Sequence, residues 1–281
     1  IAQAYWSDGD LDAGREFFLA ELRINPGDID VILDFGLFLL ELGDVEAAKE
    51  KFNRILELDP HFAPAMFYLG EIAFEKKDFD RAIEMFDEAL MADDSLPGPL
   101  FRLAQHAMEN GKLEQAHSYL ASELRLEPED AKTLVAMGSM FLETGDMSYA
   151  THCLLRSLDI DNSLADAYYY LGAMSTIQNM LDDAARFFSH CLDIDGEHIA
   201  ALRDSACVYI EMERFADAAE RIQRVLELDG NDPQARAIRR RISFTQIRCK
   251  AARLAHRIQP RFIIPTASTL NQLYSRLRKR D

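Results

Sequence analysis

A sequence repeat with a period of 34 residues runs along this 281-residue chain, and it constrains the fold more than any other feature. Residues 9–26 read GDLDAGREFFLAELRINP and residues 43–60 read GDVEAAKEKFNRILELDP, so the second copy begins 34 residues after the first. A fixed period of this length is typical of stacked supersecondary units, each of which buries its apolar face only against the next unit. The period therefore favours an elongated array over a fold with one closed core.

Four columns of residues, each followed in steps of 34, keep the same character to residue 226. The first column holds only Gly or Ala: Ala2, Gly36, Gly70, Ala104, Gly138, Gly172 and Ala206. The second is also small: Gly14, Ala48, Ala82, Ala116, Ala150, Ala184 and Ala218. The third is large and apolar: Phe18, Phe52, Phe86, Leu120, Leu154, Phe188 and Ile222. The fourth is Leu throughout: Leu22, Leu56, Leu90, Leu124, Leu158, Leu192 and Leu226.

Each unit divides into two amphipathic helices, called A and B below. In the second unit we expect helix A over residues 29–42, a Gly-Asp turn, and helix B over residues 45–58. The apolar residues of helix B form a single helical stripe: Val45, Ala48, Phe52, Ile55 and Leu56. We expect Gly36 and Ala48 to let the two helices approach closely, with Phe52 filling the neighbouring gap. Few Pro and Gly residues, nine and 13, also favour an all-α fold.

These residues resemble the tetratricopeptide repeat family. The family pattern has a small residue after an apolar one in helix A, as in MFYLG at 66–70 and YYYLG at 168–172, and Ala four residues before an aromatic in helix B, as in AIEMF at 82–86. Proline closes three units, at Pro26, Pro60 and Pro128, and the turn formers Asp94, Asn162, Gly196 and Gly230 replace it elsewhere. The resemblance implies an α-solenoid, a right-handed superhelix of antiparallel helix hairpins, whose inner surface is lined by helix A and binds peptides or helices of partner proteins.

We expect three regions along the chain. Residues 1–232 form a tetratricopeptide array of about six and a half repeats, whose first repeat is truncated because Ile1 and Ala2 match the middle of a helix A. Residues 233–258 resemble the capping helix that closes such arrays. Residues 259–281 form a basic tail, with a short amphipathic helix over TLNQLYSRLRKR.

Charge divides the chain sharply. Residues 233–281 hold 13 basic side chains and one acidic one, a net +12, whereas residues 1–232 hold 18 basic and 47 acidic side chains, a net −29. Such asymmetry is typical of an interaction tail. The four Cys residues show no CxxC pair, which favours reduced thiols and a cytoplasmic or similarly reducing compartment, and no apolar run approaches the roughly 20 residues of a membrane span.

The geometry of helix A predicts a groove-facing flank beside the core stripe. The candidate partner-binding residues on this flank are Leu33, Leu37, Leu40, Glu41, Phe67, Glu71, Phe74, Glu75, Phe101, Gln105, Met108, Glu109, Leu142, Glu143 and Tyr169. An apolar floor with Glu at its edge complements a basic or amphipathic segment of a protein partner. The alternative is that the aromatics only pack between repeats and the Glu residues are solvated helix formers.

The basic C-terminal region supplies a second candidate surface: Arg236, Arg239, Arg240, Arg241, Arg276, Arg278, Lys279 and Arg280. It could contact nucleic acid, anionic lipid or an acidic protein surface, or be a solvated cap. Since residues 1–232 are themselves acidic, the tail could dock in its own groove or in that of a neighbour, which would give self-association. Contact with nucleic acid or membrane is the less favoured option because the acidic body repels polyanions.

Catalytic patterns are weak. The chain has no phosphate-binding loop, no GxSxG and no HExxH motif, and the dipeptides His152-Cys153 and His190-Cys191 place each thiol at an apolar position of helix B. A variant of the family that grips a carboxylate with Lys, Asn and Arg is also disfavoured, because the corresponding columns hold Leu33, Leu37, Tyr68, Lys132 and Ala136. We therefore expect no cofactor and no metal, and a non-enzymatic scaffold or adaptor. The alternatives are the regulatory region of a larger enzyme, or a nucleoprotein or membrane-associated subunit.

Overall fold

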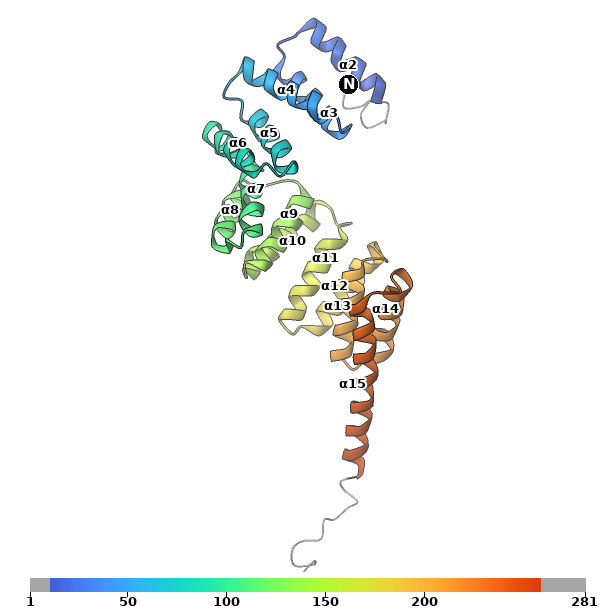
Figure 1. Ribbon diagram of the computed structural model, residues 1–281. Coiled ribbons are helices and arrows are strands. Elements are labelled where there is room, and N and C mark those ends of the chain that lie inside the picture. Colours follow the sequence, from blue (N-terminus) through green and yellow to red (C-terminus); the bar gives the residue numbers. More distant parts are fainter. Residues whose placement is uncertain (1–10, 259–281) are drawn as a thin grey trace, which may run out of the picture. The chain divides into compact units, whose positions relative to one another are not determined.

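The computed structural model describes residues 11–258, with side chains over residues 13–247 (Figure 1). Across residues 11–258 the chain forms fourteen helices and no strand. The helices fall into two compact units, unit 1 over Ile1–Asp161 and unit 2 over Asn162–Asp281. Each unit is a stack of helix hairpins, which confirms the expected all-α repeat solenoid.

Unit 1 contains four hairpins and the B helix that precedes them. That first helix is α2 (Leu11–Ile24), and it packs against α3. The hairpins are α3 (Ile29–Glu41) with α4 (Val45–Leu58), α5 (Ala63–Glu75) with α6 (Phe79–Ala92), α7 (Pro99–Glu109) with α8 (Leu113–Arg125), and α9 (Ala131–Glu143) with α10 (Met147–Ile160). Helices α3 and α4 thus match helices A and B predicted for the second unit, except that α3 ends at Glu41 and not at residue 42.

Unit 2 contains two hairpins and a terminal helix. The hairpins are α11 (Ala165–Ile177) with α12 (Leu181–Ile194) and α13 (Ile199–Glu211) with α14 (Phe215–Leu228). Helix α15 (Pro233–Ile258) packs against both α13 and α14, and Ala235 and Ile242 are its buried contacts with their core. Figure 1 shows its second half running on past the hairpin.

The reversal inside each hairpin is encoded by one left-handed residue. These residues again lie 34 apart: Gly43, Lys77, Gly111, Gly145, Asn179 and Glu213, with φ between +57° and +88°. In the first of these turns the amide of Asp44 donates to the carbonyl of Leu39 at 2.8 Å, and the Asp44 side chain accepts from the amide of Ala47, which caps helix α4. This combination of a left-handed C-terminal cap and an Asp N-cap closes helix A and opens helix B within three residues.

The small column of helix A meets the large column of helix B directly. A Cβ built on Gly36 would lie 2.5 Å from the Phe52 ring, and one on Gly172 would lie 2.8 Å from Phe188. We expected Gly36 and Ala48 to let the helices approach, with Phe52 filling the neighbouring gap, and the Phe52 ring lies directly against Gly36. The residue 16 positions after each Ala is smaller than Phe, Leu120 for Ala104 and Ile222 for Ala206, although Gly138 also faces a Leu, Leu154.

Changing Gly172 to Ala should therefore destabilise unit 2. The added methyl group gains about 1 kcal/mol of helix propensity but overpacks the Phe188 ring, at a cost of about 1–3 kcal/mol. Combining it with Phe188→Leu recreates the Ala104–Leu120 pair, so the double variant should be more stable than the two single changes predict together, by at least 0.5 kcal/mol. Urea unfolding of the four proteins measures this coupling, and strict additivity would contradict the pairing.

Candidate functional site

The A helices of unit 1, α3, α5, α7 and α9, carry fourteen of the fifteen predicted groove residues, and we call the surface they form the A-helix face. Its apolar members are half-buried: Leu33, Leu37, Leu40, Phe67, Phe74, Met108 and Leu142. Phe101 is more deeply placed, at 8% exposed. The floor of this face is thus apolar, but most of each side chain is already in contact with its own unit.

The aromatics of this face pack against neighbouring helices. The ring centroid of Phe67 lies 5.9 Å from that of Phe86, and the centroid of Phe74 lies 5.3 Å from that of Phe79 in an edge-to-face arrangement. These contacts cross from α5 to α6, so they hold the hairpin together. The aromatics therefore serve packing and leave only their outer edges for a ligand.

A row of Glu residues forms one edge of the A-helix face. Glu41, Glu75, Glu109 and Glu143 are each the last residue of their A helix, and each is exposed. The C-terminal end of a helix carries a partial negative charge, so a carboxylate there is unfavourable by about 0.3–1 kcal/mol. We call these four residues the Glu row. Their position lowers the stability of the helices but favours the binding of a cation.

Arg102 of α7 brings four of the predicted residues together. Its guanidinium donates to both carboxylate oxygens of Glu71 on α5, with Nε 2.6 Å from Oε1, and to Oε1 of Gln105 at 2.9 Å. The same group lies 5.5 Å from the ring centroid of Phe74 and 6.0 Å from that of Phe101. Burial raises the pKa of Glu71 and the pairing with Arg102 opposes this shift. We did not single out Arg102 from the sequence.

A pocket of about 390 Å³ opens on the A-helix face where α7 begins late. Helices α5 and α9 begin at Ala63 and Ala131, so the repeat predicts a start at residue 97, but α7 begins at Pro99. Two prolines flank Gly98, and the residue before a proline disfavours helical geometry, so the first half-turn is lost. The pocket, which we call the notch, is lined by Phe67, Tyr68, Glu71, Pro97, Gly98, Phe101, Arg102, Glu123, Pro128, Glu129, Asp130 and Thr133.

Two features fix the shape of this notch. Gly98 has φ +112°, and a Cβ on it would lie 2.6 Å from the Phe67 ring, so only Gly fits. Glu123 of α8, only 1% exposed, accepts hydrogen bonds from the amides of Gly98 at 2.6 Å and Phe101 at 3.3 Å. The carboxylate thereby caps the N-terminus of α7. Burial raises the pKa of Glu123, while the two amides act in the opposite direction.

Replacing Glu123 should test this cap. Glu123→Ala leaves two amides without an acceptor and should lower the free energy of unfolding by about 1–3 kcal/mol, whereas Glu123→Gln keeps one acceptor and should lose less. Because the folded-state pKa is raised, the stability that this group adds is complete below the ordinary Glu pKa and is lost as pH rises through the folded value.

The pH dependence should therefore differ between wild type and Glu123→Gln. In urea unfolding between pH 4 and pH 7, the free energy of unfolding of Glu123→Gln should rise relative to that of wild type as pH rises, because the variant has no proton to lose at this position. A constant difference across the range would contradict the raised pKa.

Unit 2 holds the remaining predicted groove residue, Tyr169 on α11. Its hydroxyl donates to Asp204 of α13 at 3.1 Å, and its ring centroid lies 4.9 Å from that of His198. Burial, with the adjacent carboxylate of Asp204, raises the pKa of Tyr169 to about 12. Tyr169 thus joins two A helices of unit 2 and remains protonated at neutral pH.

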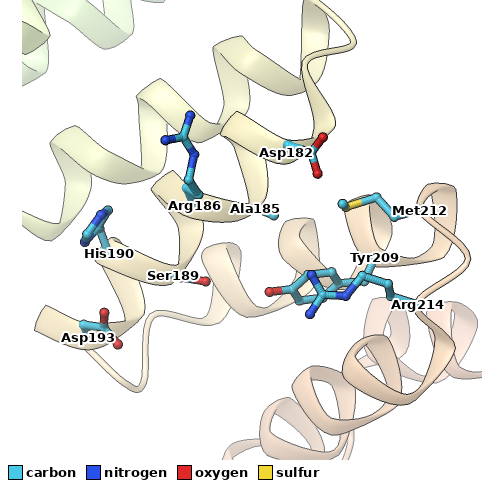
Figure 2. Close-up of a pocket in the computed structure, with 9 residues that line it drawn as sticks. All are labelled: Asp182, Ala185, Arg186, Ser189, His190, Asp193, Tyr209, Met212 and Arg214. Atoms are coloured by element: carbon cyan, nitrogen blue, oxygen red, sulfur yellow. The ribbon is translucent and has the colours of Figure 1, made fainter.

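A second pocket, of about 420 Å³, lies in unit 2 between α12 and the turn from α13 to α14 (Figure 2). Figure 2 shows Asp182, Arg186 and His190 along α12, and the side chains of Tyr209 and Arg214 lying together to one side of it. Both arginines are engaged locally: Arg186 pairs with Asp183, and the Arg214 guanidinium donates to Asp217 at 2.8 Å while lying over the Tyr209 ring. The mixed lining favours no single ligand class.

Models of the tetratricopeptide repeat match residues 33–97, 73–138 and 176–242. Together with the 34-residue columns and the hairpin stack, these matches decide the family. The chain is a tetratricopeptide repeat protein. No curated protein matches the chain significantly.

Solved structures share the fold of this tetratricopeptide repeat protein at low identity. A chain of the APC/C hetero-tetramer Cut9–Hcn1 is 19% identical with a TM-score of 0.63, over 86% of this chain and 48% of that one. PilF of Pseudomonas aeruginosa is 19% identical with a TM-score of 0.65, over 76% and 97%. The type IV pilus biogenesis factor PilW is 16% identical with a TM-score of 0.61, over 75% and 97%. The chain thus spans about half the length of the first of these.

The tetratricopeptide stack of unit 2 ends in the basic helix α15, where four residues of the predicted basic surface lie. Arg241 donates to Glu211 at 2.6 Å, and Arg236 donates to the carbonyl of Gly230 at 2.7 Å. Arg239 and Arg240 are exposed. The other four predicted residues, Arg276, Arg278, Lys279 and Arg280, and the predicted short helix lie outside the described residues.

Two of the repeat thiols lie in the hydrophobic cores. Cys153 and Cys191 are fully buried, and burial raises the pKa of each to about 12, so both remain protonated while His152 and His190 point outward. Because thiolates are the nucleophilic form, these two residues act as small apolar side chains. The described side chains include no group of three metal-ligating residues, and no helix within residues 11–258 combines the length and the apolar character that a bilayer crossing requires.

Proposed function

We propose that this chain is a non-enzymatic scaffold that holds a basic or amphipathic segment of a partner protein on the A-helix face of unit 1. Tetratricopeptide repeats and this fold are those of protein–protein interaction scaffolds. The observation that carries the finer proposal is the Glu row, which lies at the C-terminal ends of four successive A helices beside a half-buried apolar floor.

The Glu row supports binding because its carboxylates lie at the helix ends that already carry negative charge. Each carboxylate adds to the partial negative charge of a helix end, so a cation placed there is favoured by both. In unit 2 the counterpart Glu211 is paired with a residue thirty positions later. The same offset from Glu75 and Glu109 reaches Gln105 and Ser139, neither of which is basic.

Helix α15 supplies an internal example of the proposed contact. It packs against α13 and α14, and its Arg241 reaches Glu211 at the end of the A helix α13. A basic amphipathic helix thus already packs beside Glu211, the counterpart of the Glu row in unit 2. We infer that a partner segment uses the same chemistry on unit 1.

The partner segment comes from another protein or from the C-terminal tail, residues 259–281, of this chain or a neighbouring copy. The acidic body and the basic tail are complementary in charge, −29 over residues 1–232 against +4 over residues 259–281. We place the scaffold in the cytoplasm or a similarly reducing compartment, because Cys153, Cys191 and Cys207 are free thiols.

Changing the Glu row to Gln tests the proposal with two opposed readouts. The variant E41Q/E75Q/E109Q/E143Q should bind a Leu-Lys amphipathic peptide at least tenfold more weakly, with a smaller salt dependence, because four charges are lost. The free energy of unfolding should instead rise by about 1–3 kcal/mol, since each carboxylate opposes a helix dipole. Calorimetric titration and urea unfolding measure the two effects.

The matched control changes four exposed Glu residues on the B helices of the same unit, E16Q/E50Q/E88Q/E114Q. It removes the same net charge, so its binding should change by less than threefold. A Leu-Glu peptide serves as the negative probe, and a peptide of residues 259–281 tests the tail as occupant. Equal losses in both variants would show that net charge, and not the Glu row, determines binding.

A second candidate function rests on α15, where Arg239 and Arg240 are exposed next to the exposed side chains of Phe244 and Ile247. A basic and partly apolar surface of this kind suits an anionic partner, either lipid or nucleic acid.

The variant R239Q/R240Q should weaken binding of the full chain to vesicles with 30% phosphatidylserine, or to single-stranded RNA, by at least threefold at low salt. The control K112Q/K132Q removes two exposed charges from unit 1 and should have little effect. Absence of binding by the wild-type chain to either probe would eliminate this second function.

A further inference from the structure

The notch at the start of α7 is a formed pocket within the A-helix face. It combines aromatic walls, from Phe67, Tyr68 and Phe101, with five charged side chains, and its volume of about 390 Å³ lies within the ordinary range for small ligand sites. All its residues belong to unit 1. It lies at the opening of the A helices, whereas the Glu row lies at their closing ends, so the two are separated by one helix length of about 16–20 Å.

The charge of the pocket selects a cation. Its lining carries four carboxylates, from Glu71, Glu123, Glu129 and Asp130, and one guanidinium, from Arg102, for a formal charge of −3. The N-termini of α7 and α9 also face it, and each contributes about +0.5. The sum remains near −2, so an anion is disfavoured even after the helix ends are counted.

Two of the four carboxylates are already paired within the protein, which identifies the other two as the place where a cation can bind. Glu71 is held by Arg102, and Glu123 by the two amides of the α7 cap. One oxygen of Asp130 accepts from the amide of Thr133 at 2.6 Å and caps α9, so its other oxygen is left for a ligand. Glu129 lies beside it and is exposed.

The wall of the pocket already shows how a guanidinium is held. Arg102 makes a two-point contact with a carboxylate while its planar group lies near the rings of Phe74 and Phe101. A guanidinium suits this combination better than an ammonium, because it is planar, weakly hydrated and able to contact both oxygens of a carboxylate.

We propose that the pocket receives one arginine side chain of the partner segment, with the guanidinium against Glu129 and Asp130 and the aliphatic stem along Phe67 and Tyr68. This inference rests on the proposed function, because it assigns a specific anchor to the basic segment. It adds that the partner carries an arginine one helix length away from the residue that contacts the Glu row, which is about five or six residues in an extended segment.

The test uses the full chain, labelled with ¹⁵N, and three small probes. N-acetylarginine amide should shift the amide signals of Gly98, Phe101 and Thr133 saturably, and N-acetyllysine amide with a free side-chain amine should do so at least threefold more weakly. N-acetylcitrulline amide has the same shape without the charge and should cause no saturable shift.

The variant E129Q/D130N removes two charges without changing side-chain size, and Asn keeps the cap of α9. It should weaken binding of the arginine probe about fivefold. The control D87N/E88Q changes two exposed carboxylates on α6 and should leave binding unchanged.

The outcomes separate this proposal from the proposed function. Shifts at the pocket that fade in E129Q/D130N but not in D87N/E88Q support the arginine anchor. Equal binding of citrulline and arginine would overturn it, because charge would not be the basis of recognition. If Leu-Lys peptides bind through the Glu row while the arginine probe shifts nothing at Gly98 or Thr133, the anchor is wrong and the scaffold function stands.

Discussion

The contact on which the structure depends is the meeting of a small residue on helix A with a large apolar one on helix B. Gly36 against Phe52 and Gly172 against Phe188 leave no room for a methyl group, so the two helices of a hairpin are fixed at one depth of contact. Where the small residue is Ala, the partner shrinks to Leu120 or Ile222. Because a small residue of helix A and a large apolar residue of helix B recur at the same positions in every hairpin, successive hairpins are similar enough for the stack to propagate.

The sequence predicted the repeat, the family and the helix bounds because these depend on local periodicity. Helix α4 begins and ends where the apolar stripe of residues 45–58 predicts. It also predicted small residues at the interhelix contact with Phe52 in the gap beside them, but periodicity alone could not say that the Phe52 ring lies directly on Gly36. That assignment depends on the angle at which two helices cross, which is a tertiary property.

The candidate site was harder to predict because its details depend on departures from the repeat. Arg102 and Glu123 lie 31 and 25 residues from their partners Glu71 and Gly98, so no single-helix pattern reveals these contacts. The signal available was the segment Leu96-Pro97-Gly98-Pro99, whose two prolines interrupt the start of a helix that the other units begin without interruption. The groove residues themselves remain predictions, although the structure shows that those on α5 and α7 share a network through Arg102.

The late start of α7 also bears on how such a chain can change over generations. Loss or gain of a whole 34-residue copy keeps the spacing of the stack, because each copy contacts only its neighbours. The notch, however, draws on α5, on the α7–α8 hairpin and on the first turn of α9. Replacing any one of these elements with the equivalent from another repeat would remove the notch. These three neighbouring units must therefore be kept together, whereas the units around them can be duplicated or lost.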